Sequence, residues 1–486
     1  MVYLKGAEVI EGGDFLGLGD IADSLARSVE DAASRTKSAM FEPVIRLGVT
    51  GLSRAGKTVF ITSLVANLLD RGRMPQLLAA SSGAIRAAYL QPQPDDAVPR
   101  FEYENHLAAL TGPAPHWPQS TRYVSQLRVS MKVQPAGLLS GLSGPRTVHL
   151  DIVDYPGEWL LDLGLMDQSF ADWSAEVLAR NASREFAAEF LAMAGDFHAR
   201  DTFEESDAQA LAQSFTATLN AARQAGYSDC APGRFLLPGE LEGSPVLTFA
   251  PLAKPDRPAR RGLWREMERR FEAYKSRIVA PFFRDHFARI DRQIVLVDAL
   301  GAIHSGPPAV EDLRHAMADV LKAFRPGRNS WLSFLLGKRV DRILFAATKA
   351  DHLHHSQHPK LTAIMEALLR EARDRAEFAG ADTAAISIAS LRATVEETLD
   401  HKGRTLDCVR GILDETGKAA AFYPGELPSD PAQLLVPAGQ GETKWLDGDY
   451  KVMNFRPARL DLRPGFGPPH IRLDKAAEFL LGDRLR

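Results

Sequence analysis

The chain has 486 residues, 45% hydrophobic and 25% charged, which allows roughly two to four domains and excludes global disorder. Its 58 basic and 62 acidic residues give a net charge of -4, so no overall basic field would attract nucleic acid, and no nucleic-acid partner is expected. The two cysteines, Cys230 and Cys408, form neither a disulfide framework nor a zinc cluster and indicate a reducing compartment.

The chain contains no apolar run of membrane-spanning length, and its first residues lack the apolar core of a secretory signal. We therefore expect a cytoplasmic protein, and peripheral contact with a membrane stays open. Residues 20–38 carry apolar side chains at helical spacing, which predicts an amphipathic helix. We expect this helix to pack on the main domain, although it could also meet a partner.

The first predicted strand is the apolar run from Val44 to Val49, and a helix follows Lys57 and stops near Gly72. Residues 73–122 are rich in turn-forming residues. Two strands are then expected, at Tyr123–Val133 and Thr147–Val153, with a hairpin turn between them.

Residues 160–290 change character, because their patterns are mostly helical. The strands resume after this helical insertion and alternate with helices, which predicts a mostly parallel sheet with crossover helices. The tail has one strand candidate (YKVMNF) and a final helix (DKAAEFLLGDRL). The later strands are expected at Gln293–Val297, Arg342–Ala347 and Thr383–Ile388, and the helices at 309–324 and 358–379.

Residues 51–58 (GLSRAGKT) fit the pattern G-x-x-x-x-G-K-[ST] and lie between a predicted strand and a predicted helix. Gly51 and Gly56 allow the backbone to fold around phosphates, and the amides at the helix start point at anionic oxygens. Lys57 would neutralise the β- and γ-phosphates, and the Thr58 hydroxyl would bind Mg²⁺. The other predicted nucleotide contacts in this loop are Ser53, Arg54 and Ala55, of which Arg54 could also face solvent.

An aspartate and a glycine three residues apart follow the strand LDIV. Asp154 would hold Mg²⁺ through water, and Gly157 would offer its N–H to the γ-phosphate. Asp298 and Gly301 repeat this spacing after another strand. We prefer Asp154, because the order of strands places its strand next to that of the phosphate loop, and we expect Asp298 to be a packing or turn residue.

Two further residues are candidates for catalysis beside Lys57. Glu158 occupies the position where Ras-like proteins use a glutamine to orient the attacking water, but its charge would repel the γ-phosphate, so its role stays open. Thr121, just before a predicted strand, is placed to reach Mg²⁺ as a switch threonine. Ser120 is the neighbouring alternative, and an ordinary polar turn is the competing interpretation.

TKAD, residues 348–351, follows the strand that ends at Ala347 and fits the guanine signature [N/T]-K-x-D, so Thr348, Lys349 and Asp351 are predicted to contact the nucleotide. The Asp351 carboxylate can accept hydrogen bonds from guanine N1–H and the 2-amino group, a donor pair that adenine lacks. The stem of Lys349 can cover one face of the base. Ser390 and Leu391 resemble the last GTPase signature, whose backbone amides meet guanine O6.

Four histidines follow this signature. They could be read as a metal site, but no cysteine or carboxylate spacing completes one in the sequence. We therefore expect a solvated helix start. These histidines are His352, His354, His355 and His358.

The elements and motifs together predict an α/β fold: the mostly parallel sheet of a P-loop NTPase of the Ras-like GTPase kind, flanked by helices and carrying a large helical insertion. Ligands in such sheets bind at the carboxyl ends of the strands, where every motif lies. The expected parts are an N-terminal helical segment (1–40), a P-loop GTPase domain (41–159 and 291–419), the helical insertion (160–290) and a C-terminal extension (420–486).

Four stretches, GLSRAGKTVFITSLVANLL, WPQST, DYPGEWLLDL and TKADHL, resemble the YcjX-like family of bacterial P-loop GTP-binding stress proteins. The resemblance covers most of the chain, including the helical insertion and the segment FYPGELP near the C-terminus. It implies an association with stress responses but no particular partner. It also implies GTP and Mg²⁺ binding through Lys57, Thr58, Asp154, Lys349 and Asp351.

Three functions remain open at this point. The first is a Mg²⁺-dependent GTPase, slow or activator-dependent, that hydrolyses GTP to GDP and phosphate and acts as a switch. The second is a nucleotide-gated interaction protein with negligible hydrolysis, which Glu158 favours. The third is an ATP-using P-loop enzyme, against which the TKAD stretch argues. In the first two cases we expect an unidentified protein partner to bind the helical insertion.

Overall fold

The computed structural model describes residues 42–52, 55–119, 123–135, 144–197, 200–286, 289–324, 340–375, 381–442, 444–445 and 453–486. The predicted N-terminal helix at 20–38 lies outside the described residues. The same is true of most of the predicted hairpin turn at 137–146, and of the first three residues of the strand candidate at 450–455.

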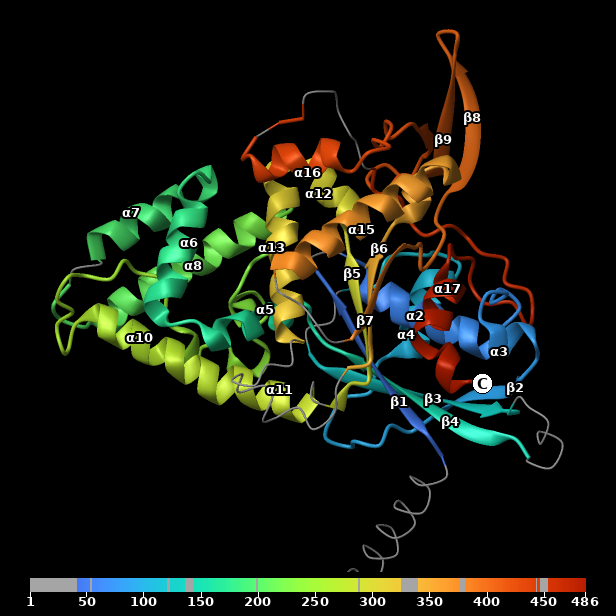
Figure 1. The fold of residues 1–486 in the computed structure, drawn as a ribbon, viewed down its shortest axis with the longest axis horizontal. Helices are drawn as coiled ribbons and strands as arrows, with labels where there is room; N and C mark the ends of the chain where they lie inside the picture. Colours follow the sequence, from blue (N-terminus) through green and yellow to red (C-terminus); the bar gives the residue numbers. More distant parts are fainter. Residues whose placement is uncertain are drawn as a thin grey trace, which may run out of the picture.

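A seven-stranded sheet forms the centre of the molecule, in the order β2-β3-β4-β1-β5-β6-β7 (Figure 1). β1 runs parallel to both β4 and β5, and β5, β6 and β7 continue in parallel; β3 is antiparallel to β2 and to β4. The prediction of a mostly parallel sheet is therefore confirmed. The strands are β1 Val44–Gly51, β2 Ile85–Gln91, β3 Ser125–Val133, β4 Arg146–Asp154, β5 Arg292–Val297, β6 Arg342–Ala347 and β7 Asp382–Ser387.

The central strands are buried on both faces because helices cover each side of the sheet. Along β5, Ile294 and Leu296 belong to one hydrophobic cluster, and Val295 and Val297 belong to the other, as the alternation of a strand requires. α2 (Lys57–Leu69) and α17 (Leu473–Leu481) supply the first cluster. α12 (Ala299–Ser305), α13 (Pro307–Ala323) and α15 (His358–Arg375) supply the second.

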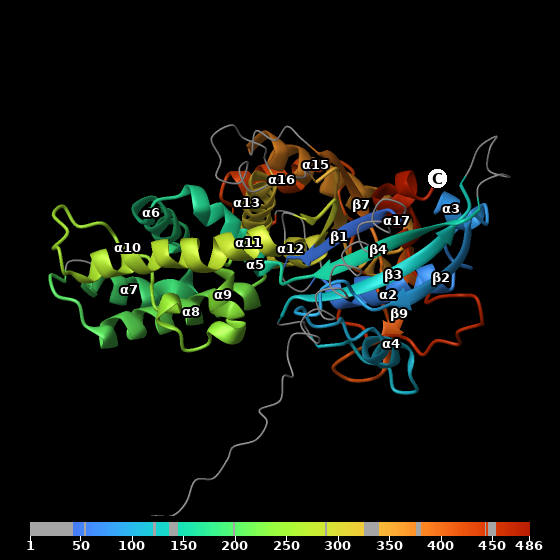
Figure 2. The same ribbon diagram turned by 90° about the horizontal axis from the view of Figure 1, so that it is seen from below.

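The helical insertion follows β4 and precedes β5 in the chain, and it forms a lobe beside the sheet (Figure 2). Its centre is aromatic: Trp173 stacks on Phe271 with ring centroids 4.9 Å apart, and Phe215 and Phe249 meet Trp173 edge-on. The helices are α5 Glu158–Leu161, α6 Phe170–Asn181, α7 Ala188–Phe197, α8 Glu205–Gln224, α9 Gly233–Leu236, α10 Leu263–Tyr274 and α11 Ala280–His286.

None of the helices in the described part of the chain combines the length and the apolar composition that a membrane span needs.

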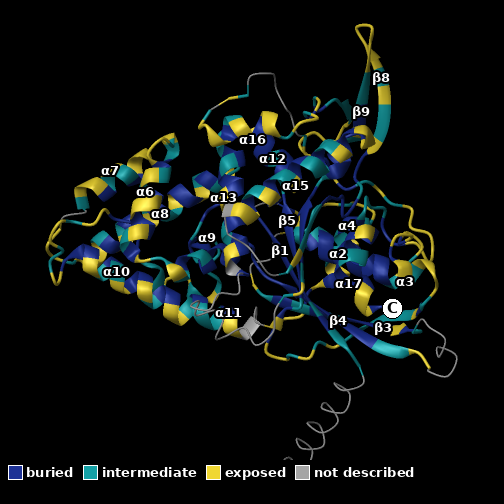
Figure 3. Cartoon of the chain, in the orientation of Figure 1, coloured by how far each residue is buried: buried dark blue, intermediate teal, exposed yellow. Residues whose placement is uncertain are grey.

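Two regions contain structure that the sequence patterns did not indicate. Residues 73–122 include strand β2 and the short helices α3 (Leu78–Ser81) and α4 (Tyr103–Thr111). A second, antiparallel sheet in the order β10-β9-β8 follows β7 and extends away from the body of the molecule, with many exposed residues along β8 and β9 (Figure 3). Its strands are β8 Val395–His401, β9 Arg404–Ile412 and β10 Ala419–Phe422, and helix α16 spans Ala432–Gly439.

The C-terminal segment returns to the main sheet and is anchored by a buried arginine of β5. The guanidinium of Arg292 donates to the carbonyl oxygen of Leu480 at 3.1 Å and pairs with Asp483 at 2.8 Å and Asp341 at 2.5 Å. The last residues of the chain thus pack against β5 and β6 of the main sheet.

Candidate nucleotide site

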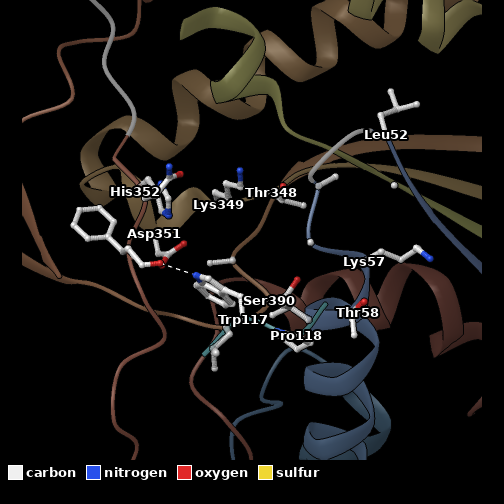
Figure 4. A pocket seen from close by; sticks show the side chains of 18 of the residues that line it. Leu52, Lys57, Thr58, Trp117, Pro118, Thr348, Lys349, Asp351, His352 and Ser390 are labelled. Carbon is white, nitrogen blue, oxygen red and sulfur yellow. Dashed lines mark hydrogen bonds between the residues drawn. The ribbon is translucent and has the colours of Figure 1, made fainter. Parts of the chain in front are cut away.

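A cavity of about 370 Å³ lies at the carboxyl ends of the parallel strands (Figure 4). Parallel strands place their carboxyl ends at one sheet edge, so β1, β6 and β7 bring three sequence motifs to the same cavity. The walls come from the GKT loop at one end, the TKAD loop and residues 389–391 at the other, and from segments around residues 117 and 455.

The phosphate end follows from the way β1 passes into α2. Gly51 is the last residue of β1, and α2 begins at Lys57, so the free amides at the start of the helix open toward the cavity. Gly56 adopts a left-handed conformation with φ 75°, which favours glycine. Ser53 and Arg54 lie outside the described residues. The described loop residues that line the cavity are Gly51, Leu52, Ala55, Gly56, Lys57 and Thr58.

Asp154 ends β4 beside this loop and is almost completely buried. One carboxylate oxygen, Oδ1, forms an ion pair with the Lys57 ammonium group, whereas Oδ2 has no hydrogen-bond partner among the described residues. A buried carboxylate oxygen without a partner is costly unless a cation binds it. Thr58 follows this lysine in the chain and lines the cavity, and a hydroxyl together with a carboxylate fits Mg²⁺, which prefers oxygen ligands. Thr121 and Ser120 lie outside the described residues.

The competing aspartate, Asp298, also follows a strand adjacent to β1, so adjacency alone does not separate it from Asp154. Its contacts do. The Asp298 carboxylate accepts a hydrogen bond from the N–H of Gly301 at 3.0 Å and so caps α12, and it forms an ion pair with Lys349. Asp298 therefore braces the TKAD loop and the start of a helix.

Gly157 approaches the phosphate loop so closely that no side chain fits there. A Cβ atom at this position would lie 2.0 Å from the carbonyl oxygen of Gly51. The next residue, Glu158, is buried and pairs with Arg223 of α8, their Oε1 and Nη2 atoms 3.2 Å apart. Glu158 and Arg223 both line the cavity, although no motif in the sequence points to the arginine.

The base end is formed by the TKAD loop. Lys349 takes a left-handed conformation with φ 60°, which turns the chain after β6. Asp351 is 4% exposed, and its Oδ2 accepts a hydrogen bond from the N–H of Ala393 at 2.8 Å, which fixes the carboxylate at the cavity wall. The N–H of Thr348 donates to the carbonyl oxygen of Val297 at 2.9 Å. Ser390 and Leu391 line the same end of the cavity.

The cavity has an aromatic wall that motif analysis did not identify. The indole N–H of Trp117 donates to the carbonyl oxygen of Phe455 at 2.7 Å (the dashed line at Trp117 in Figure 4), and the ring of Phe455 meets His352 edge-on. Burial lowers the pKa of His352, so the imidazole is neutral near pH 7. Asp414 and Asn454 complete this side. Trp117 lies in WPQST, His352 in TKADHL, and Asn454 and Phe455 in the strand candidate YKVMNF, but none of them had been predicted to line the nucleotide site.

The histidines after the TKAD loop do not form the expected solvated helix start. His352, His354 and His358 are buried, and only His355 is largely exposed. The fold also brings a carboxylate to them that spacing could not reveal, because Glu396 of β8 lies 2.6 Å from Nδ1 of His355. The prediction of a solvated helix start was wrong because tertiary contacts bury three of the four rings, and the carboxylate was missed because β8 was not recognised.

Comparison with known proteins agrees with the arrangement of these motifs. Residues 45–485 match the family described as YcjX-like family, DUF463. The chain is 36% identical over 459 residues to a protein of Escherichia coli (strain K12) named Ras-like GTPase YcjX, covering 91% of this chain and 96% of that protein. A protein of the same name from Shewanella oneidensis (strain MR-1) is 33% identical over 467 residues, covering 91% and 94%. The resemblance found in the sequence is thereby confirmed, and the chain belongs to the YcjX-like family.

Proposed function

We propose that the chain binds GTP with Mg²⁺ in this cavity and hydrolyses it to GDP and phosphate. One observation carries the proposal: a single cavity has the GKT loop at one end and the TKAD loop at the other. A triphosphate and a guanine base need these two kinds of group at opposite ends of one site. The relatives named Ras-like GTPase support the same activity.

Each group has a defined task in this proposal. The amides of the phosphate loop and the Lys57 ammonium group bind the β- and γ-phosphates. Mg²⁺, held by Thr58 and Asp154, supplies charge neutralisation at these oxygens. Asp351 accepts hydrogen bonds from guanine N1–H and the 2-amino group. Ser53, Arg54, Gly157, Ser390 and Leu391 stay predicted nucleotide contacts, Thr121 a predicted metal ligand, and Lys349 a predicted cover for the base.

We expect Lys57 to change partners when the nucleotide binds. Its ammonium group is paired with Asp154, so phosphate binding would draw it away and leave the carboxylate to the metal. A ligand that brings an anion for Lys57 and a cation for Asp154, as Mg²⁺-GTP does, offsets the cost of separating this pair. This exchange would give the protein two states and make it a nucleotide-dependent switch. In this proposal a protein partner binds the helical insertion, and the switch acts in the stress response.

The proposal is tested by phosphate release from GTP in the presence of Mg²⁺, for the wild type, Lys57→Ala and Lys322→Ala. Lys322 is half exposed and pairs with Asp319 on α13, so its loss controls for removal of a lysine. We expect Lys57→Ala to abolish turnover and Lys322→Ala to retain it. Equal turnover in all three proteins would contradict the proposal.

A nucleotide-gated interaction protein with negligible hydrolysis is the second candidate. The observation that favours it is the pairing of Glu158 with Arg223, because a carboxylate already engaged by an arginine is poorly placed to orient water. Single-turnover hydrolysis of bound GTP, measured with and without cell extract, separates the two. A bound triphosphate that stays intact in both conditions would favour this candidate.

A further inference from the structure

The helical insertion contributes a charged side chain to the nucleotide cavity. Arg223 lies in the last turn of α8, far from every motif in the sequence, yet it lines the same cavity as Lys57 and Thr58. It pairs with Glu158, and the two side chains are 25% and 10% exposed, respectively. A partly desolvated guanidinium in a phosphate-binding cavity is a strong anion-binding group.

The insertion holds this arginine in a defined place because it packs tightly against the segment that carries Glu158. A Cβ atom on Gly233 of α9 would lie 2.3 Å from the carbonyl oxygen of Glu158. The N–H of Gly233 donates to Asp162 at 2.6 Å, and the indole N–H of Trp159 donates to the carbonyl oxygen of Leu237 at 3.3 Å. The insertion and the residues after Gly157 therefore form one packed unit, which is the pre-organisation that electrostatic catalysis needs.

We propose that Arg223 is a catalytic residue of GTP hydrolysis, an inference that rests on the proposed function. In the structure Glu158 binds the guanidinium; in the transition state the guanidinium keeps this partner and also donates to the oxygens of the nucleotide phosphates, because it carries five N–H donors. The water oxygen forms a bond to the γ-phosphorus, and the bond from this phosphorus to the β–γ bridging oxygen breaks. The electron pair of that bond goes to the β-phosphate of GDP; one water proton passes to another oxygen of the released phosphate, and the second stays on the oxygen that attacked. Arg223 offsets the negative charge that develops on these oxygens.

This role also accounts for the glutamate at position 158. A carboxylate beside the γ-phosphate would repel it, unless a cation neutralises the carboxylate. Arg223 does so, and Glu158 in turn holds the guanidinium beside the cavity. The alternative is a structural role, in which Arg223 only compensates the buried charge of Glu158. The two roles differ in what happens when Glu158 carries no charge.

The test uses the full chain and six proteins: wild type, Arg223→Ala, Arg223→Lys, Glu158→Gln, the double variant Glu158→Gln/Arg223→Ala, and Arg265→Ala. Arg265 is a half-exposed arginine of α10 that pairs with Glu268, so it controls for loss of an arginine from the insertion. Affinity is measured with a fluorescent GTP analogue, and the rate by single-turnover hydrolysis of bound GTP. Binding of GDP with aluminium fluoride gives a second readout of transition-state stabilisation that does not need fast turnover.

We expect Arg223→Ala to slow hydrolysis by about 10³-fold while GTP affinity changes far less. Arg223→Lys should restore little of the rate, because an ammonium group lacks the planar fork of the guanidinium. In the Glu158→Gln background the loss of Arg223 should again slow hydrolysis, and each variant without Arg223 should lose the tighter binding of GDP that aluminium fluoride produces.

The inference is overturned if Arg223→Ala hydrolyses GTP at the wild-type rate. It is also overturned if Arg223→Ala slows hydrolysis only while Glu158 is charged, or if aluminium fluoride tightens GDP binding equally in all six proteins. Thermal unfolding shows whether each variant folds. If Arg223→Ala is destabilised because Glu158 is buried without its partner, the double variant, in which position 158 is uncharged, still tests the role of Arg223. A wild type that binds no guanine nucleotide would instead refute the proposed function.

Discussion

The contact between Gly157 and the phosphate loop leads to a quantitative prediction for Gly157→Ala. The new Cβ atom would lie 2.0 Å from the carbonyl oxygen of Gly51, whereas ordinary contact begins at 3.4 Å, so the two segments must separate by about 1.4 Å (3.4 − 2.0). The obstructing atom is backbone, which cannot rotate away as the end of a side chain can. Gly51 lines the cavity, so the shift moves the phosphate loop itself.

Displacement of a binding group by about 1 Å costs roughly 10²-fold in an organised site. We therefore expect Gly157→Ala to weaken GTP binding and slow turnover by about that factor, with a loss of about 1–3 kcal/mol in the free energy of unfolding. Fluorescent GTP titration and denaturant unfolding measure the two effects. The matched control is Gly195→Ala in α7, where a Cβ atom meets nothing within 4 Å and alanine favours the helix. Wild-type GTP affinity in Gly157→Ala would refute the reasoning.

Three further predictions concern groups around the site. Burial raises the pKa of Asp162 to about 7 from 3.8, so the folded state keeps a proton that the unfolded state has lost. The free energy of unfolding should therefore fall as pH rises between these values. Thermal scans should show that the stability of Asp162→Asn depends less on pH than that of the wild type. Asp298→Ala removes the cap of α12 and the partner of Lys349, and should cost about 1 kcal/mol in denaturant unfolding and weaken GTP binding in fluorescence titration. Arg292→Met breaks the anchor to Asp341 and Asp483 and should lower the free energy of unfolding by about 2 kcal/mol, again measured with denaturant.

The parallel strands of the main sheet could be predicted because they are largely apolar and each ends in a recognisable motif, whereas the edge strand β2 was not predicted. Val44–Gly51 and Arg342–Ala347 are short, nearly continuous apolar runs next to GKT and TKAD. The second sheet could not be predicted in the same way. β8 reads VEETLDH, and every one of its residues is exposed or only partly buried, so it lacks the buried apolar face that period-two analysis detects.

The phosphate and base ends of the cavity could be anticipated for the same reason, because each is a local loop with its own spacing. The side walls could not. Trp117 and Phe455 are separated by 338 residues, and Arg223 reaches Glu158 only because the insertion folds back on the segment after Gly157. Such pairs depend on tertiary packing, which leaves no periodic or spaced signal in the sequence.

Calorimetric titration with Mg²⁺ tests the central claim most directly, using GTP, ATP and xanthosine triphosphate with the wild type, Asp351→Asn and the exposed control Asp400→Asn. The account predicts that the wild type and the control bind GTP and bind ATP much more weakly. In Asp351→Asn the preference should pass to xanthosine triphosphate, because an amide can donate to the carbonyl that replaces the 2-amino group. Absence of heat with any guanine nucleotide, or equal binding of ATP and GTP by the wild type, would contradict the account.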